Sequence, residues 1–198
     1  MHYEKDVVKI ARESLNYARE NNDITKMKNA VFEALGRMIY TAQQYGIILC
    51  HENEAKIYGD THIRCRELLD YFDGKLKCVF DMGNFVLEGV DPYSEAYNLL
   101  KNDIAYFHIK DALKQGAIVP PGTGDAQIKK ILDEHRTYVK EDFFVSLEPH
   151  LQLSSGHNAL VGRSFENPYQ YSDEKEAFLD AVTRFLELIQ NEKRFIIN

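Results

Sequence analysis

Residues 47–54 of the chain read Ile47-Ile48-Leu49-Cys50-His51-Glu52-Asn53-Glu54. They form a short apolar run that follows Gly46 and ends in two carboxylates. An uninterrupted apolar run of this length is typical of a strand that is buried on both faces, as in a parallel sheet. Functional groups of parallel α/β proteins gather at the carboxyl ends of the strands, which is where Glu52 and Glu54 would lie.

The same pattern recurs in three more apolar runs, each followed by a side chain that can bind a metal ion: 76–80 by Asp81, 104–107 by His108, and 143–147 by Glu148. Neighbouring parallel strands bring their carboxyl ends together, so these side chains and Glu52 can converge. Taken singly, such a carboxylate is commonly a helix cap or a solvated loop residue, and such a histidine is commonly a hydrogen-bonded core residue. Repetition at four strand ends favours a shared metal site without deciding it. Three carboxylates and one imidazole suit Mn²⁺, Mg²⁺ or Co²⁺ and are also compatible with Zn²⁺.

Helices are predicted between and around these runs, because apolar side chains recur there at every third or fourth position. The expected helices cover 4–20, 24–45, 61–72, a segment opened by Pro92, 126–135 and 174–192. Asp125 is expected to cap the helix at 126–135, and Asp60 or Thr61 the helix at 61–72. Alternating strands and helices without a break in composition predict an α/β fold, with a parallel sheet flanked by helices, in a single domain over 1–198.

The composition disfavours several classes of protein. The chain of 198 residues carries a net charge of −7 and has no basic patch, which argues against a nucleic-acid partner. We find no apolar segment long enough to span a membrane and no signal-peptide pattern at the N-terminus, so no membrane partner is expected. The three cysteines form no CxxC motif, which predicts reduced thiols in a cytoplasmic protein.

Five short motifs resemble those of one known superfamily. They are His51-Glu52-Asn53-Glu54, Asp81-Met82-Gly83-Asn84, His108-Ile109-Lys110-Asp111, the Pro-Gly-Thr-Gly-Asp loop at 121–125, and Leu147-Glu148-Pro149-His150. Together, over about residues 24–190, they resemble the xylose isomerase-like TIM-barrel superfamily, which contains tagatose/psicose 3-epimerases and inosose dehydratases. The resemblance implies that one divalent metal is bound by Glu52, Asp81, His108 and Glu148. It also implies that the two glutamates transfer the proton.

The activity implied by this resemblance is a divalent-metal-dependent isomerase or epimerase of a small carbohydrate, free or phosphorylated. It would act by proton transfer through a metal-stabilised enediolate. Three further residues are candidates for substrate contacts, each with a plain structural alternative: Glu54 as a helix cap, Asn84 as a turn residue, and Lys110 as a surface lysine. The glycines at 122 and 124 either hold a substrate phosphate or only turn the chain.

A complete (β/α)₈ barrel takes about 250 residues. The four strand-like runs here match the last four units of the family barrel, so we expect a partial barrel. Two alternative functions stay open. The first is an endonuclease IV-like DNA repair enzyme, which is disfavoured because Asn84 stands where that group has a histidine. The second is a truncated, non-catalytic half-barrel.

Four strands leave two sheet edges and one sheet face without a partner. Side chains expected on that face are Ile48, Cys50, Val79, Tyr106 and Val145. Either the helix at 4–20 or a second copy of the chain would cover them. We expect the second copy, and therefore a homodimer.

Overall fold

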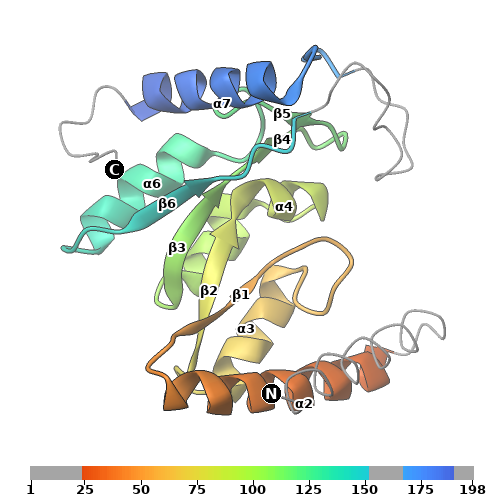
Figure 1. Ribbon diagram of the computed structural model, residues 1–198, viewed down its shortest axis with the longest axis vertical. Helices are drawn as coiled ribbons and strands as arrows, with labels where there is room; N and C mark the ends of the chain where they lie inside the picture. Colours follow the sequence, from red (N-terminus) through yellow and green to blue (C-terminus); the bar gives the residue numbers. More distant parts are fainter. Residues whose placement is uncertain (1–23, 152–166, 190–198) are drawn as a thin grey trace.

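A parallel four-stranded sheet forms the centre of the protein, which we describe from a computed structural model covering residues 24–151 and 167–189. The strand order is β1-β2-β3-β6, with β1 at Leu49–Glu52, β2 at Leu76–Asp81, β3 at Ile104–Ile109 and β6 at Phe144–Leu147 (Figure 1). All three pairings are parallel, which confirms the predicted fold class. The helix expected at 4–20 lies outside the described residues.

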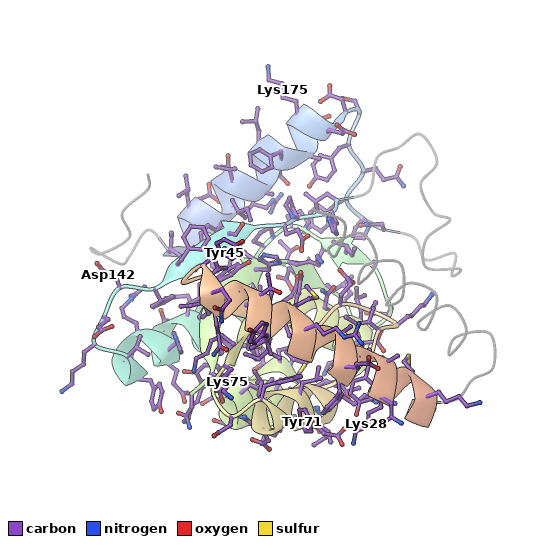
Figure 2. All side chains as sticks on the ribbon, turned by 60° about the horizontal axis from the view of Figure 1, so that its bottom comes forward. Lys28, Tyr45, Tyr71, Lys75, Asp142 and Lys175 are labelled. Carbon is purple, nitrogen blue, oxygen red and sulfur yellow. The ribbon has the colours of Figure 1, made fainter. Side chains whose placement is uncertain are left out.

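Helices follow the strands in the alternating order that the sequence predicts. They are α2 (Ile24–Gln44), α3 (His62–Tyr71), α4 (Met82–Leu87), the π-helical turn η1 (Pro92–Tyr97) that continues into α5 (Asn98–Leu100), α6 (Ile128–Tyr138) and α7 (Glu174–Ile189). Helices α2 and α7 lie at opposite ends of the molecule (Figure 1). Figure 2 shows α2 across the near side, with Lys28 close to its start and Tyr45 just beyond its end. No helix within the described ranges is long and apolar enough to cross a membrane.

One helix and one two-stranded ribbon were not predicted. Helix α4 begins directly after β2, where Asp81 caps it by accepting a hydrogen bond from the Asn84 backbone N–H. The strands β4 (Asp111–Ala112) and β5 (Ile118–Val119) form a short antiparallel ribbon between β3 and α6. The helix and the two strands of the ribbon are all too short to produce a hydrophobic period that sequence patterns can detect.

The predicted helix caps have mixed outcomes. Thr61 caps α3, as expected, by accepting a hydrogen bond from the Arg64 backbone N–H. The prediction for Asp125 is wrong, because α6 begins at Ile128 and the Asp125 carboxylate accepts a hydrogen bond from the Lys114 backbone N–H instead.

The sheet has one face packed against helices and one face with a looser cover. Phe80 pairs with Phe107, and Phe107 with Val145, so these three side chains point to the helix side, where the first two are fully buried. The expectation that Val145 lines the other face is therefore wrong, and it packs against the core. The opposite face carries the register partners Val79, Tyr106 and Phe144, and Phe144 is 64% exposed.

One histidine is part of the aromatic core. His135 is buried in α6, and its Nδ1 lies 3.2 Å from the Tyr97 hydroxyl. Its ring centroid is 4.8 Å from that of Phe107 and 4.9 Å from that of Phe143. Because water is excluded from this cluster, the charged imidazole is disfavoured and the pKa of His135 falls to about 4.

This depressed pKa predicts acid sensitivity. The unfolded chain takes up a proton at the ordinary histidine pKa of about 6.5, whereas the folded chain does so only near 4. The contribution of His135 to stability is therefore complete above about pH 6.5 and is lost as the pH falls toward about 4, by up to about 3 kcal/mol. Urea denaturation at a series of pH values measures this loss.

The variant His135→Phe keeps a ring in the cluster and removes the titrating group, so its free energy of unfolding should fall less on acidification. His150→Gln is the matched control, because the His150 side chain is 56% exposed. Parallel pH profiles for wild type and His135→Phe would show that burial of His135 does not produce the acid sensitivity.

Candidate metal centre

Four side chains converge at the carboxyl end of the sheet. Each of Glu52, Asp81, His108 and Glu148 offers one ligand atom, and these atoms all lie within 4.8 Å of one another. They come from the ends of four adjacent strands. Asp81 and His108 are direct register partners, and the Glu148 backbone N–H donates to the Ile109 carbonyl at 3.2 Å, which extends the pairing of β3 and β6 by one residue. The fold thus brings together the four residues predicted as metal ligands.

His108 lies between the two glutamates. Its Nδ1 is 2.8 Å from Glu52 Oε1 and 3.2 Å from Glu148 Oε2. The hydrogen bond with Glu52, helped by the negative charges around it, raises the pKa of His108. Partial burial raises the pKa of Glu52, but the hydrogen bond and charge of His108 outweigh it, so the pKa of Glu52 lies below its ordinary value. Glu52 is therefore an ionised carboxylate at neutral pH.

Asp81 is the most deeply buried of the four. Its Oδ1 accepts a hydrogen bond of 2.8 Å from the Asn84 backbone N–H. Burial raises the pKa of Asp81 to about 6, although the Lys110 ammonium, 3.1 Å from Oδ2, opposes the rise. Asp81 Oδ2 and Glu148 Oε2 are both buried without a hydrogen bond of good geometry. The Lys110 ammonium lies 3.1 Å from each of these oxygens, and a cluster of three carboxylates and one imidazole with so few well-formed hydrogen bonds fits a divalent metal ion.

Lys110 is not the surface lysine that one interpretation of the sequence allowed. It is only 1% exposed, and its Nζ lies 3.1 Å from Asp81 Oδ2 and 3.1 Å from Glu148 Oε2. The same Nζ donates a hydrogen bond of 3.2 Å to Asn84 Oδ1. Burial lowers the pKa of Lys110, but the two carboxylates outweigh it and hold the pKa above its ordinary value. Asn84 is a buried residue of α4 and not a turn residue.

Glycine is required beside this lysine. A Cβ atom at Gly83 would lie 2.8 Å from Lys110 Cγ and 2.9 Å from the Lys110 carbonyl oxygen. Such distances are far inside van der Waals contact, so only glycine lets α4 pass this close to the end of β3.

The motif at 51–54 contains a structural residue that the sequence analysis missed. Asn53 is fully buried, its Nδ2 donates to the Asp81 carbonyl at 2.9 Å, and its Oδ1 accepts from the Asp81 backbone N–H at 2.9 Å. This pair of hydrogen bonds fixes the end of β1 relative to the end of β2. Glu54 is not in the cluster; its Oε1 accepts a hydrogen bond from the Ala55 backbone N–H. Because Thr61 caps α3, the helix-cap alternative for Glu54 is wrong, and its contact with substrate stays a prediction.

The glycine loop is organised by Asp111, a second residue that the sequence analysis missed. The Asp111 carboxylate accepts four backbone hydrogen bonds of 2.8–3.0 Å, from Ala112, Gly122, Gly124 and Ala126. The amides of Gly122 and Gly124 are therefore already used, which favours a structural turn over a phosphate site. The sequence feature that could have indicated this role is the position of Asp111 at the end of the motif at 108–111.

A family model described as "Xylose isomerase-like TIM barrel" matches residues 6–179. The chain belongs to the xylose isomerase-like TIM barrel family. This confirms the family inferred from the five motifs. A search of curated proteins finds no match.

Several solved structures share this fold at low sequence identity. D-psicose 3-epimerase from Clostridium cellulolyticum H10, solved with D-tagatose, gives a TM-score of 0.58 at 16% identity over 83% of this chain and 56% of its own. A xylose isomerase-like TIM barrel protein from Mycobacterium smegmatis, in complex with magnesium, gives a TM-score of 0.59 at 17% identity. The match covers 85% of this chain and 52% of that protein. The probable 3-DHS dehydratase AsbF from Bacillus anthracis gives a TM-score of 0.54 at 19% identity, over 84% of this chain and 58% of its own. The chain thus spans little more than half the length of these three proteins.

Replacing Asp111 tests its role in the loop. Asp111→Asn puts an amide where four backbone N–H groups converge. We expect a loss of at least about 2 kcal/mol in the free energy of unfolding, because several donors lose a charged acceptor. Amide hydrogen exchange at Gly122, Gly124 and Ala126 should also become faster.

The matched control is Asp125→Asn, in the same loop, whose carboxylate accepts a single backbone hydrogen bond, from Lys114. It should cost less than about 1 kcal/mol. Equal losses in the two variants, measured by urea denaturation, would contradict the role given to Asp111.

Proposed function

We propose that this chain is a divalent-metal-dependent sugar isomerase or epimerase that acts on a small carbohydrate or its phosphate ester. The observation that carries the proposal is the convergence of three carboxylates and one imidazole at the ends of four parallel strands. Membership of the xylose isomerase-like family supports it. So does the epimerase among the structures that share the fold.

In this proposal Glu52, Asp81, His108 and Glu148 hold one divalent ion. A set rich in oxygen ligands favours Mn²⁺, Mg²⁺ or Co²⁺, and Zn²⁺ is compatible with it. When bound, such an ion stabilises negative charge that develops on a substrate oxygen next to the carbon losing its proton.

In this proposal two of the four residues, Glu52 and Glu148, also transfer the proton. Glu52 ends β1 and Glu148 directly follows β6, the two outer strands of the sheet, and their side chains are 27% and 30% exposed. Asp81, from an inner strand, is fully buried and has no access to substrate. A carboxylate on each side of a bound sugar removes the proton from one face of the carbon and returns one to the other. The lowered pKa of Glu52 keeps it ionised and able to accept a proton.

The endonuclease IV-like alternative is less well supported. A three-zinc site needs several more histidines, and the metal-binding group found in the described part of the chain has four residues and a single histidine. Asn84, at the position where that group has a histidine, is buried and bonded to Lys110. Experiment distinguishes the proposed enzyme from a non-catalytic half-barrel, because a half-barrel would bind the metal ion but would not convert any sugar.

Metal binding is the first test. Protein stripped of metal should bind one Mn²⁺ ion, and saturation at about 100 times the dissociation constant should add about 3 kcal/mol to stability. Asp81→Asn should lose most of this gain, whereas Glu54→Gln, outside the cluster, should keep it. Calorimetry and thermal denaturation measure both quantities. Failure of wild type to bind Mn²⁺, Mg²⁺ or Co²⁺ would refute the proposal.

Turnover is tested with Glu148→Gln, which is close in shape but cannot accept a proton. We expect this variant to lose epimerisation or isomerisation of ketose substrates by about 10²-fold or more and to keep its fold. Deuterium exchange from solvent into the sugar measures proton transfer directly. Metal binding by wild type without turnover on any sugar would favour the non-catalytic half-barrel.

We also propose that the protein is a homodimer in the cytoplasm. The edge strands β1 and β6 have no further partner strand in the described residues, and neither contains the proline or lysine that often protects an exposed edge. Ile48, beside β1, is 71% exposed, and Phe144, in β6, is 64% exposed. Burial of these apolar side chains against a second copy would stabilise the assembly.

Light scattering coupled to size-exclusion chromatography tests the assembly. Wild type should elute as a dimer at micromolar concentration, and Phe144→Glu should shift it toward monomer. Tyr71→Glu is the control, because Tyr71 is similarly exposed, at 66%, on helix α3. A wild type that stays monomeric would refute the homodimer.

A further inference from the structure

Lys110 places a full positive charge inside the cluster of proposed metal ligands. The cluster contains three carboxylates, from Glu52, Asp81 and Glu148, and one histidine. The Lys110 ammonium contacts two of these carboxylates at 3.1 Å each. With the histidine neutral, as a metal ligand must be, the ligands carry a charge of −3, and Lys110 brings the total to −2. This is the charge that one divalent ion neutralises.

The contacts of Lys110 leave little for a substrate. An ammonium group has three N–H donors, and three oxygen atoms surround this one, from Asp81, Glu148 and Asn84. The residue is 1% exposed, so a sugar hydroxyl cannot reach Nζ without displacing one of them. A buried lysine charge is tolerated only when it is paired, as it is here.

The side chain is also held in position along its length. Helix α4 crosses it at Gly83, where an added Cβ would lie 2.8 Å from Lys110 Cγ. Asn84, from the same helix, accepts a hydrogen bond of 3.2 Å from the ammonium. The ammonium is therefore fixed by α4 at one place relative to Asp81 and Glu148.

We infer that Lys110 is a positioning residue that sets the net charge of the metal centre and so its preference for divalent over trivalent cations. It holds the carboxylates of Asp81 and Glu148 together when no ion is bound. Its charge also repels the bound ion and limits the affinity. This inference rests on the proposed metal-dependent function.

Removing this charge has two opposite effects. The metal-free protein becomes less stable, because the carboxylates of Asp81 and Glu148 lose the ammonium that pairs with them. Metal binding becomes tighter, because the ammonium no longer repels the cation. A residue that only contacts substrate would change the KM and leave metal affinity unaltered.

The test compares Lys110→Met with Lys77→Met. Lys77, in strand β2, is paired with Asp103 at 3.3 Å and lies near the other end of the sheet. Each variant removes one lysine, so both change the net charge of the chain equally. The thermal denaturation of the metal-free protein is measured at about pH 8. This pH lies above the pKa of about 6 to which burial raises Asp81, so the Asp81 carboxylate is ionised. Dissociation constants for Mg²⁺ and Tb³⁺ are then measured by calorimetry and terbium luminescence.

Lys110→Met should melt at a lower temperature without metal and bind Mg²⁺ about tenfold tighter or more. Its affinity for Tb³⁺ should increase by a larger factor than that for Mg²⁺, because the repulsion scales with the charge of the ion. Lys77→Met should leave both dissociation constants unchanged. If Lys110→Met folds only with metal present, Lys110→Gln, which is neutral but able to form hydrogen bonds, gives the same comparison.

The outcomes separate this inference from the function on which it rests. Wild type that binds no divalent ion refutes the proposed metal-dependent function. Wild type that binds Mg²⁺, with equal or weaker binding by Lys110→Met and an unchanged ratio of Tb³⁺ to Mg²⁺ affinity, refutes the role of Lys110 alone.

Discussion

Mutual repulsion of three carboxylates within 4.8 Å is the constraint on which the rest of the site depends. Such a group is stable only if each charge is paired or held by hydrogen bonds. His108 pairs with Glu52, and the Lys110 ammonium bridges Asp81 and Glu148. Neutral neighbours complete the support, because Asn53 fixes the backbone at Asp81 and Gly83 leaves room for the lysine. The residues around the proposed ligands therefore have geometric requirements as strict as those of the proposed ligands.

Two buried aspartates near the same strand ends show how a structural carboxylate differs from a proposed metal-binding one. Asp111 accepts four backbone hydrogen bonds, which use its oxygens and close the loop at 122–126. Asp81 accepts one, and its Oδ2 is left without a hydrogen bond of good geometry. A satisfied carboxylate stabilises the fold, whereas an unsatisfied one beside other carboxylates can bind a cation. This difference supports a structural role for the glycine loop and favours the cluster at the strand ends as the proposed metal site.

One face of the sheet carries the buried aromatic core, and the other carries the proposed ligands. On one face Phe80 and Phe107 pack with Tyr97 and His135 to form an aromatic core beneath the helices. The other face leads from Phe144 and Tyr106 to the proposed ligands, because the register aligns Tyr106 with Phe144 and Asp81 with His108. Exposed apolar side chains thus share a face with the proposed catalytic groups, so a surface that covers them would also enclose the site.

The sequence by itself determined the parallel α/β fold, the family and the four converging side chains, because buried strands are continuous apolar runs and their carboxyl ends meet at one edge. The tertiary structure alone decided features that depend on distant partners. These are the burial of Lys110, the hydrogen bonds of Asn53 and Asp111, the face on which Val145 lies, and the later start of α6. Asp111, for example, bonds with residues up to 15 positions away, and no local period or cap motif reports such a contact. Hydrophobic patterns describe how segments meet the core, whereas polar contacts between segments are fixed only when the chain has folded.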